Sequence, residues 1–272
     1  MNIRTMPRTH LLSAIEFAKQ AGAFTLDYFY DPGLVVERKR DATPVTAADR
    51  GAERILRERI SERFPQDSIV GEEFPVREGT SEYRWILDPI DGTKSFIHGV
   101  PTYSTLIGIE KNGEPVIGVI ALPALREVLW ASKGEGAWHE TPRSEKPVRA
   151  RVSACPALDC GLFLVSEVLT FTKTGRLDAY LELQNTAGLT SSWGDAYGYF
   201  LVATGRAEVM IDPDLNLWDA APLLPIITEA GGHFTDWQGN PTIHNEEAVA
   251  TNGILHEEVM TITRRYSKQP AA

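Results

Sequence analysis

Residues 85–96 read WILDPIDGTKSF, and this stretch decides how the rest of the chain is interpreted. The aromatic and branched residues at 83–87 are typical of a buried strand. Pro89 favours an extended conformation for the residue before it, Asp88. A sharp turn of the backbone after the proline would then bring the side chains of Asp88 and Asp91 to the same side. The stretch therefore predicts a strand that ends in two neighbouring carboxylates.

The residues after the second acid are suited to an anion. Gly92 permits a close approach of the backbone to a ligand, and the N–H groups of Gly92 and Thr93 would open a short helix that can hold a phosphate. Carboxylates beside such an anion cradle suggest a metal ion that lies between the protein and a phosphate group.

The size and charge of the chain exclude several classes of protein. A chain of 272 residues with 43% hydrophobic residues buries roughly three quarters of its unfolded surface. We therefore expect a single domain, with an N-terminal α+β half at 1–148 and a C-terminal α/β half at 149–272. A formal net charge of −10 argues against sequence-independent binding of nucleic acid, which needs clustered Lys and Arg. The same charge makes a phosphorylated substrate hard to bind without divalent cations.

The chain has no signal for a membrane or for an oxidising compartment. No apolar run approaches the roughly 18–20 residues of a membrane span, and residues 1–10 lack the apolar centre of a signal peptide. Cys155 and Cys160 have a spacing that fits neither a redox pair nor a zinc site, so we expect two reduced structural thiols. These features favour a cytoplasmic enzyme without a membrane or nucleic-acid partner.

The order of apolar patterns and turn signals predicts layered α and β structure. Asn112-Gly113 is a strong signal for a two-residue hairpin, and 138–158 is expected to cross the surface between two halves. The expected helices are 9–30, the run that opens at Thr46, 176–184, 194–204, 218–230 and 255–266; the expected strands are 68–70, 83–87, 103–110, 114–122, 126–132, 162–165, 207–211, 234–237 and 248–251.

Two further acids lie in the first turns of predicted helices. Thr46 followed by Asp49 matches a capping box, so Asp49 is interpreted either as a helix cap or as a carboxylate aimed into a site. Asp219 begins an otherwise apolar helix and has the same two interpretations. Glu72 follows the strand at 68–70 and can share one cleft with the two acids of the opening stretch.

These acids favour magnesium over other cofactors. The sequence has no nucleotide-binding motif, no nucleophile elbow of the α/β-hydrolase type and no zinc-protease motif. Residues 212–219 lack the glycine that a calcium-binding loop needs. A D-x-D pair for an aspartyl nucleophile is also absent, which leaves direct attack by water. Two Mg²⁺ ions about 3.5–4 Å apart can hold the attacking water and the leaving oxygen. The hard oxygen ligands that suit Mg²⁺ are offered by Glu72, Asp88, Asp91 and Asp219.

Three motifs resemble the inositol monophosphatase family of Mg-dependent, lithium-sensitive phosphatases. They are GEE at 71–73, WILDPIDGTKS at 85–95 and WDAAPLLPIITEAGG at 218–232, and a similar order and spacing extends over residues 10–262. The resemblance implies a layered α-β-α-β-α sandwich of the sugar-phosphatase type. It also implies a homodimer that acts on a small-molecule phosphomonoester.

The same resemblance implies roles for individual residues. The water-activating threonine would be Thr93, acting with Glu72 and supported by Asp49. The phosphate would rest on Gly92 and Thr93. The metal ligands would be the side chains of Glu72, Asp88, Asp91 and Asp219 and the backbone carbonyl of Ile90.

A narrower resemblance concerns the substrate. WGDAYGY at 193–199 is similar to a segment of the histidinol-phosphate phosphatases of this family, with Ala196 in place of their usual cysteine. Asp195 and Asp212, together with Asp91, would meet the amine or imidazole of histidinol, a cation that an acidic pocket favours. Ala121-Leu122 replaces a polar pair that is common in that subgroup.

The leading hypothesis is hydrolysis of histidinol phosphate to histidinol and phosphate, with water activated by two metal ions. One alternative is inositol-1-monophosphatase or broad small-molecule phosphatase activity. A more remote alternative is a non-catalytic scaffold that binds metal or phosphate. Because these hypotheses share the motifs of the metal site, the choice of substrate depends on Asp195, Asp212 and their neighbours.

Overall fold

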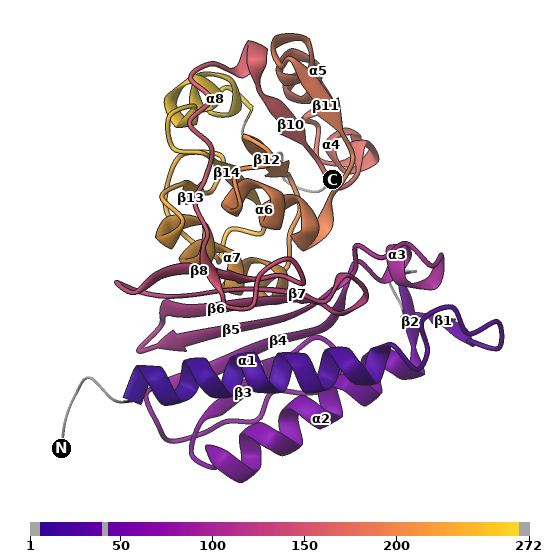
Figure 1. Ribbon diagram of the computed structural model, residues 1–272. Helices are drawn as coiled ribbons and strands as arrows, with labels where there is room; N and C mark the ends of the chain where they lie inside the picture. Colours follow the sequence, from indigo (N-terminus) through magenta and orange to yellow (C-terminus); the bar gives the residue numbers. More distant parts are fainter. Residues whose placement is uncertain (1–5, 40–42, 267–272) are drawn as a thin grey trace.

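The computed structural model describes residues 6–39 and 43–266 of the chain (Figure 1). Its elements stack as helices, sheet, helices, sheet and helices. The layered α-β-α-β-α sandwich expected from the sequence is therefore confirmed. Within these two ranges, no helix combines the length and the apolar character that a membrane crossing requires.

The first layer consists of α1 (Met6–Thr25) and α2 (Ala47–Arg63), which cover one face of a seven-stranded sheet. Their apolar faces pack on the sheet through a cluster that includes Phe17, Leu56 and Trp85. Strands β3 and β4 are parallel, and the other neighbours are antiparallel. The strands, in the order of the sheet, are β3 (Ser68–Gly71), β4 (Tyr83–Asp91), β5 (Ser104–Lys111), β6 (Glu114–Leu122), β7 (Glu127–Ser132), β8 (Gly136–Glu140) and β9 (Val148–Arg149).

The middle layer consists of α6 (Asp195–Ala203) and α7 (Leu217–Glu229), which lie between the two sheets. Helix α7 packs very closely on the first sheet because β5 and β6 present Gly108 and Gly118 to it. A Cβ added at Gly118 would lie 2.0 Å from the carbonyl oxygen of Pro222. The close packing brings the first turn of α7, with Asp219, next to the end of β4.

The second sheet has five strands in the order β11-β10-β12-β14-β13. Strand β10 is parallel to β11 and β12, and β14 is antiparallel to β12 and β13. The strands are β10 (Leu162–Leu164), β11 (Leu189–Ser191), β12 (Val209–Asp212), β13 (His233–Thr235) and β14 (Ala248–Thr251). The outer helices α4 (Val168–Lys173), α5 (Leu177–Thr186) and α8 (His256–Thr263) complete the sandwich through a cluster that includes Phe171, Leu183 and Met260.

Three short elements lie beside the main layers (Figure 1). Strands β1 (Val36–Arg38) and β2 (Pro44–Thr46) form a small antiparallel pair before α2, and α3 (Thr93–Ile97) follows directly after β4. The predicted Asn112-Gly113 hairpin is confirmed, since both residues have positive φ values, 53° and 80°, between β5 and β6.

Several predicted boundaries were wrong. Helix α1 ends at Thr25 instead of 30 because the next residues form turns, in which Tyr30 has a φ of 67°. Strand β4 continues through Pro89 to Asp91. The proline is tolerated because the pairing of β4 with β5 shifts register between Asp88 and Asp91.

The expected surface crossing at 138–158 was also partly wrong. Strands β8 and β9 extend the first sheet, with Trp138 paired to Arg149. The expected boundary between halves, after 148, falls inside β9. The short elements β1, β2, α4 and β11 were not predicted, because three to six residues carry too little periodicity.

Candidate active site

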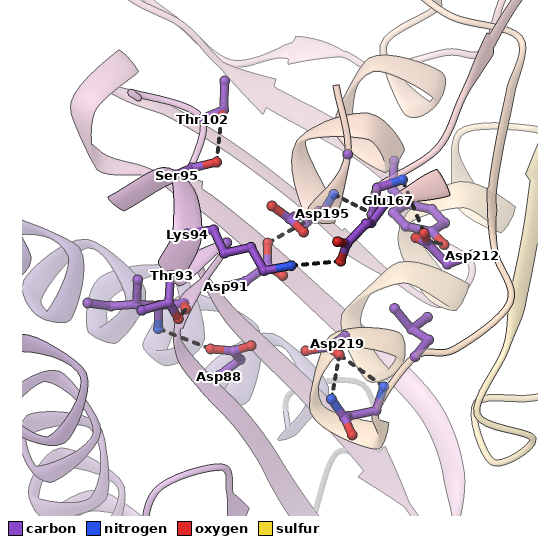
Figure 2. Close-up of a pocket in the computed structure, with 18 of the residues that line it drawn as sticks. Asp88, Asp91, Thr93, Lys94, Ser95, Thr102, Glu167, Asp195, Asp212 and Asp219 are labelled. Carbon is purple, nitrogen blue, oxygen red and sulfur yellow. Dashed lines mark hydrogen bonds and ion pairs between the residues drawn. The ribbon is translucent and has the colours of Figure 1, made fainter. Parts of the chain in front are cut away.

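A cavity of about 500 Å³ opens where the end of β4, helix α3 and the first turns of α6 and α7 meet (Figure 2). The residues that line it come from both halves of the chain. Every predicted site residue except Asp49 is among them: Glu72, Asp88, Ile90, Asp91, Gly92, Thr93, Asp195, Asp212 and Asp219.

The irregular end of β4 brings its two acids into this cavity. The register with β5 shifts between Asp88 and Asp91, and the N–H of Ile90 donates to Oδ1 of Asp88 at 3.0 Å. Single carboxylate oxygens of Asp88, Asp91 and Asp219 lie within 4.8 Å of one another. We call these three residues the acid cluster.

Asp219 satisfies both interpretations that its sequence position allows. Its Oδ2 accepts a hydrogen bond from the N–H of Asn216 at 2.9 Å, which completes a capping box at the start of α7. One oxygen of the same carboxyl group lies within 4.8 Å of a carboxylate oxygen of Asp88. The cap holds the carboxylate in the cavity, so the helix-capping role and a role in the site support each other.

The acid cluster is electrostatically unfavourable without a cation. Burial raises the pKa of Asp88 well above its usual range, and the charges of Glu72, Asp219 and Asp91 raise it further. Burial likewise raises the pKa of Asp91, and it raises that of Glu72 to about 7. Carboxylates buried this close together are not all charged at neutral pH unless a cation joins them. Hard oxygen donors in this arrangement fit a divalent metal ion.

Glu72 lies beside the acid cluster and is held by a lysine that the sequence did not assign to the site. Nζ of Lys39 lies 2.6 Å from Oε1 of Glu72, and the same ammonium group contacts Glu73. Although burial opposes it, these two carboxylates raise the pKa of Lys39. No local pattern could reveal this contact, because Lys39 and Glu72 are 33 positions apart.

Asp49 lies outside the residues that line the cavity. It is 1% exposed, and its Oδ2 accepts hydrogen bonds from the N–H of Thr46 at 2.8 Å and from the Thr46 hydroxyl at 2.6 Å. The capping box expected at the start of α2 is therefore confirmed. A supporting role of Asp49 in catalysis stays a prediction.

The sequence predicted that a short helix opens at Gly92 and Thr93, and α3 begins there. Gly92 has a φ of 75°, and a Cβ at this position would lie 2.9 Å from Oδ2 of Asp195, so only glycine fits without strain. Thr93 begins α3, and its hydroxyl donates to the carbonyl of Ile90 at 3.1 Å. The threonine therefore already contacts the carbonyl that the family pattern assigns to a metal.

Asp195 brings the second half of the chain to the acid cluster. It opens α6, its own N–H donates to the hydroxyl of Ser166 at 2.8 Å, and the next N–H, of Ala196, donates to Oδ2 of Asp91 at 2.9 Å. Burial and the charge of Asp219 raise the pKa of Asp195 to about 6. Its carboxylate lines the cavity next to Asp91 and Gly92 (Figure 2).

Asp212 ends β12 and is more strongly bound into the fold. It is 3% exposed, its Oδ2 accepts from the hydroxyl of Tyr199 at 2.8 Å, and its Oδ1 accepts from the N–H of Ser166 at 3.2 Å. Burial raises its pKa to about 7 despite these donors. Asp212 therefore positions Ser166 and Tyr199 around the same cavity that it lines.

The family assignment rests on a comparison of the whole chain. The model of the inositol monophosphatase family matches residues 8–268. The chain belongs to this family. Its solved members include an inositol monophosphatase from Zymomonas mobilis, with a TM-score of 0.82 and 30% identity over 95% of this chain and 99% of that one. The suhB protein of Bartonella henselae has a TM-score of 0.86 and 28% identity over 94% and 99% of the two chains.

Relatives of known name within the inositol monophosphatase family are phosphatases. The histidinol-phosphatase of Chlorobaculum parvum is 43% identical over 88% of this chain and 90% of its own length. That of Streptomyces coelicolor is 41% identical over 92% and 95%. A fructose-1,6-bisphosphatase/inositol-1-monophosphatase of Thermotoga maritima is 31% identical over 80% and 81%.

Proposed function

We propose that this chain hydrolyses histidinol phosphate to histidinol and inorganic phosphate, and that it requires Mg²⁺. Membership of the inositol monophosphatase family makes it a phosphoric monoester hydrolase that acts on a small phosphomonoester. The observation that supports this choice of substrate is the acidic character of the cavity outside the proposed metal ligands, to which Asp195 and Asp212 contribute. Relatives named histidinol-phosphatase, at 36–43% identity, support the same choice.

The proposed metal ligands fit Mg²⁺ by chemistry and by geometry. Carboxylate and carbonyl oxygens are its preferred ligands, and the raised pKa values of Asp88 and Asp91 indicate a site that gains from a cation. When bound, Mg²⁺ supplies the charge that activates water and neutralises the phosphoryl oxygens. The ligands in this proposal are Glu72, Asp88, Asp91, Asp219 and the carbonyl of Ile90.

The chain's own residues would bind and orient the reactants. The N–H groups of Gly92 and Thr93 would donate to the phosphate, because the backbone turns there at a left-handed glycine. The hydroxyl of Thr93 and the carboxylate of Glu72 would orient the attacking water and accept its proton. Asp49 would act on Thr93 and Glu72 only indirectly, through β2, which ends at Thr46.

The cationic end of the substrate would lie in the outer part of the cavity. Asp195 offers a carboxylate that accepts no hydrogen bond from the described residues, and it lines the cavity beside Gly92. Asp212 is already bonded to Tyr199 and Ser166. We therefore assign the direct contact with the amine or imidazole to Asp195, and a supporting contact to Asp212.

A kinetic comparison of substrates tests this proposal. Phosphate release is measured with histidinol phosphate, inositol-1-phosphate and fructose-1,6-bisphosphate, each with Mg²⁺ and with EDTA. We expect kcat/KM to be at least about 10-fold higher for histidinol phosphate than for the others, since one charge-assisted contact separates them. EDTA should abolish the release from every substrate.

The other outcomes of this experiment identify the alternatives. Faster hydrolysis of inositol-1-phosphate would favour an inositol-1-monophosphatase, the name of relatives such as that of Rhizobium meliloti at 34% identity. No release from any phosphomonoester would favour a non-catalytic scaffold. The homodimer and the cytoplasmic location stay predictions, and size-exclusion chromatography with light scattering tests the first of them.

A further inference from the structure

An ion pair crosses the mouth of the active-site cavity and joins the two halves of the chain. Nζ of Lys94, on α3, lies 2.7 Å from Oε2 of Glu167, which precedes α4. Both residues line the cavity, and Figure 2 shows the pair in front of Asp91, between Asp195 and Asp219. The two residues are 73 positions apart, and neither was assigned a role from the sequence.

Lys94 is the single lysine or arginine among the described residues that line this cavity. The same lining carries many carboxylates: Glu72, Asp88, Asp91, Glu167, Asp195, Asp212, Asp214 and Asp219. Those near the end of β4 are accounted for by a divalent metal. Glu167 and Asp195 are not among those ligands, and the ammonium group of Lys94 is the cation that the chain itself provides for them.

The contact between Lys94 and Glu167 is easily exchanged. The two side chains are 66% and 42% exposed, and an ion pair with such exposure is worth less than about 1 kcal/mol. The hydrogen bond from Lys94 lowers the pKa of Glu167, so this carboxylate is charged at neutral pH. Glu167 makes no side-chain cap at the start of α4. Its carboxylate is therefore available to a stronger cationic partner.

We propose that Glu167 is a specificity-determining residue that binds the cationic group of the substrate, and that Lys94 holds this position in the free enzyme. The inference rests on the proposed function, because it needs a substrate with a cation at the end opposite the phosphate. The phosphate lies at Gly92, one of the two basic groups of the substrate contacts Asp195, and the other replaces the ammonium of Lys94 at Glu167.

Two substitutions test the proposal with two substrates. With Glu167→Gln, the KM for histidinol phosphate should rise about 10-fold while kcat stays within about twofold, because a charged contact made only by the cationic end is lost. The KM for inositol-1-phosphate, which has no cationic group, should stay the same or fall. With Lys94→Met, the KM for histidinol phosphate should stay the same or fall, because Glu167 loses its competitor.

Glu182→Gln is the matched control, since Glu182 is a similar exposed ion-pair partner on α5 that contacts Arg265 outside the cavity. It should change neither KM. An equal rise of KM for both substrates with Glu167→Gln, or no rise for histidinol phosphate, would overturn the assignment of Glu167. If the wild-type enzyme prefers inositol-1-phosphate, the proposed function itself fails. If it prefers histidinol phosphate and Glu167→Gln keeps the KM, this inference alone fails.

A second inference concerns the two cysteines, which lie outside the cavity. Both are free, as expected, but Cys160 is exposed and so is not a core thiol. The Sγ atoms of Cys155 and Cys160 lie 2.9 Å apart, and both contact the carbonyl oxygen of Ala157. The fold holds this segment in place, because Asn252 donates to the carbonyl of Cys155 and the N–H of Leu158 donates to Glu258.

We infer that Cys155 and Cys160 form a dithiol site that reacts with low-molecular-weight disulfides. The exposed Cys160 thiolate attacks the small disulfide, forms a mixed disulfide and releases one small thiol. The Cys155 thiolate then attacks the Cys160 sulfur and releases the second small thiol. Two protein thiols are thereby oxidised to one disulfide while the small disulfide is reduced. The hydrogen bond with Cys160 raises the pKa of Cys155, in keeping with Cys160 as the residue that reacts first.

Intact-mass spectrometry after incubation with oxidised glutathione tests this site. The wild-type protein should lose two hydrogens and keep no glutathione. Cys155→Ser should keep one glutathione on Cys160, and Cys160→Ser should react much more slowly. A wild-type protein that keeps glutathione, or that does not react at all, would overturn the inference. Neither result depends on the substrate of the enzyme.

Discussion

The buried carboxylate of Asp67 and the buried carboxylates of the acid cluster have opposite electrostatic environments. Asp67, 4% exposed, lies between α2 and β3 and is hydrogen-bonded with His10 Nε2 at 3.0 Å, Ser81 Oγ at 2.6 Å and Trp85 Nε1 at 2.8 Å. Although burial opposes it, these contacts lower the pKa of Asp67. In the acid cluster, burial and neighbouring acids raise the pKa values instead.

The difference shows what each group contributes. Three side chains donate hydrogen bonds to the charged carboxylate of Asp67, so its burial stabilises the fold. Asp88, which is 2% exposed, has one backbone donor and three acidic neighbours. Its burial costs stability unless a cation binds. Equal burial therefore indicates a structural role for Asp67 and supports the metal site that we propose at the acid cluster.

The largest expected effect is on catalysis. Asp88→Asn should lower the Mg-dependent release of phosphate at least about 100-fold, since it removes a charged metal ligand. Asp67→Asn should keep the wild-type rate per folded molecule, because Asp67 does not line the cavity. Active enzyme is counted from the folded fraction measured by circular dichroism. Comparable losses in the two variants would remove the distinction between the two sites.

The next effect is on stability. Asp67→Asn should lower the free energy of unfolding by about 2–3 kcal/mol, because the charge that accepts from Trp85 and Ser81 is lost. Urea denaturation in EDTA measures it. Ser81→Ala is a milder companion change that removes one of the donors. A neutral result for Asp67→Asn would mean that its hydrogen bonds only balance its burial.

Magnesium should stabilise the wild-type protein by linkage. At a concentration of about 100 times Kd the gain is about 2.7 kcal/mol. Asp67→Asn should gain the same amount, because its metal site is intact. Paired urea titrations with Mg²⁺ and with EDTA check this. A smaller gain in Asp67→Asn would indicate that the two sites are coupled.

Per pH unit, the smallest expected effect is the pH dependence of stability without metal. Burial raises the folded pKa of Asp212 to about 7, above its unfolded value of about 4. The contribution of Asp212 to the free energy of unfolding is therefore present below pH 4 and is lost as the pH rises to 7. The contribution of Asp67 depends on pH in the opposite direction. Because the folded pKa of Asp67 is lowered, its contribution is full above pH 4 and is lost in acid.

Stability measured in EDTA from pH 3 to 8 checks both signs. Asp212→Asn should remove a slope on the order of 1 kcal/mol per pH unit between pH 4 and 7. The difference between Asp67→Asn and wild type should shrink below pH 4. A wild-type stability that rises steadily from pH 4 to 7 would contradict the sign assigned to Asp212.

The structural features that the sequence predicted depend on local patterns. Thr46 and Asp49 form a capping box, Asn112-Gly113 forms a hairpin, and a short helix opens after Gly92, each within a few residues. The residues predicted for the acid cluster do lie together, because long motifs specify both their spacing and the elements that carry them.

The parts that the sequence did not predict depend on contacts between distant residues. Lys39 reaches Glu72, and Lys94 reaches Glu167, across 33 and 73 positions. Strands as short as β9 exist only through pairing with a neighbour. The donors to Asp67 likewise come from separate elements, so its sequence position gave no sign of its role.

We propose that the acid cluster is a metal site whose charges oppose folding until a cation binds. The most direct test compares the free energy of unfolding of Asp88→Asn and wild type in EDTA and in Mg²⁺. The amide that this substitution introduces can still accept from the N–H of Ile90 and can donate to Asp219. We predict that the variant is more stable than wild type in EDTA and less stable in Mg²⁺. A variant that is less stable than wild type by the same amount in both conditions would contradict the account.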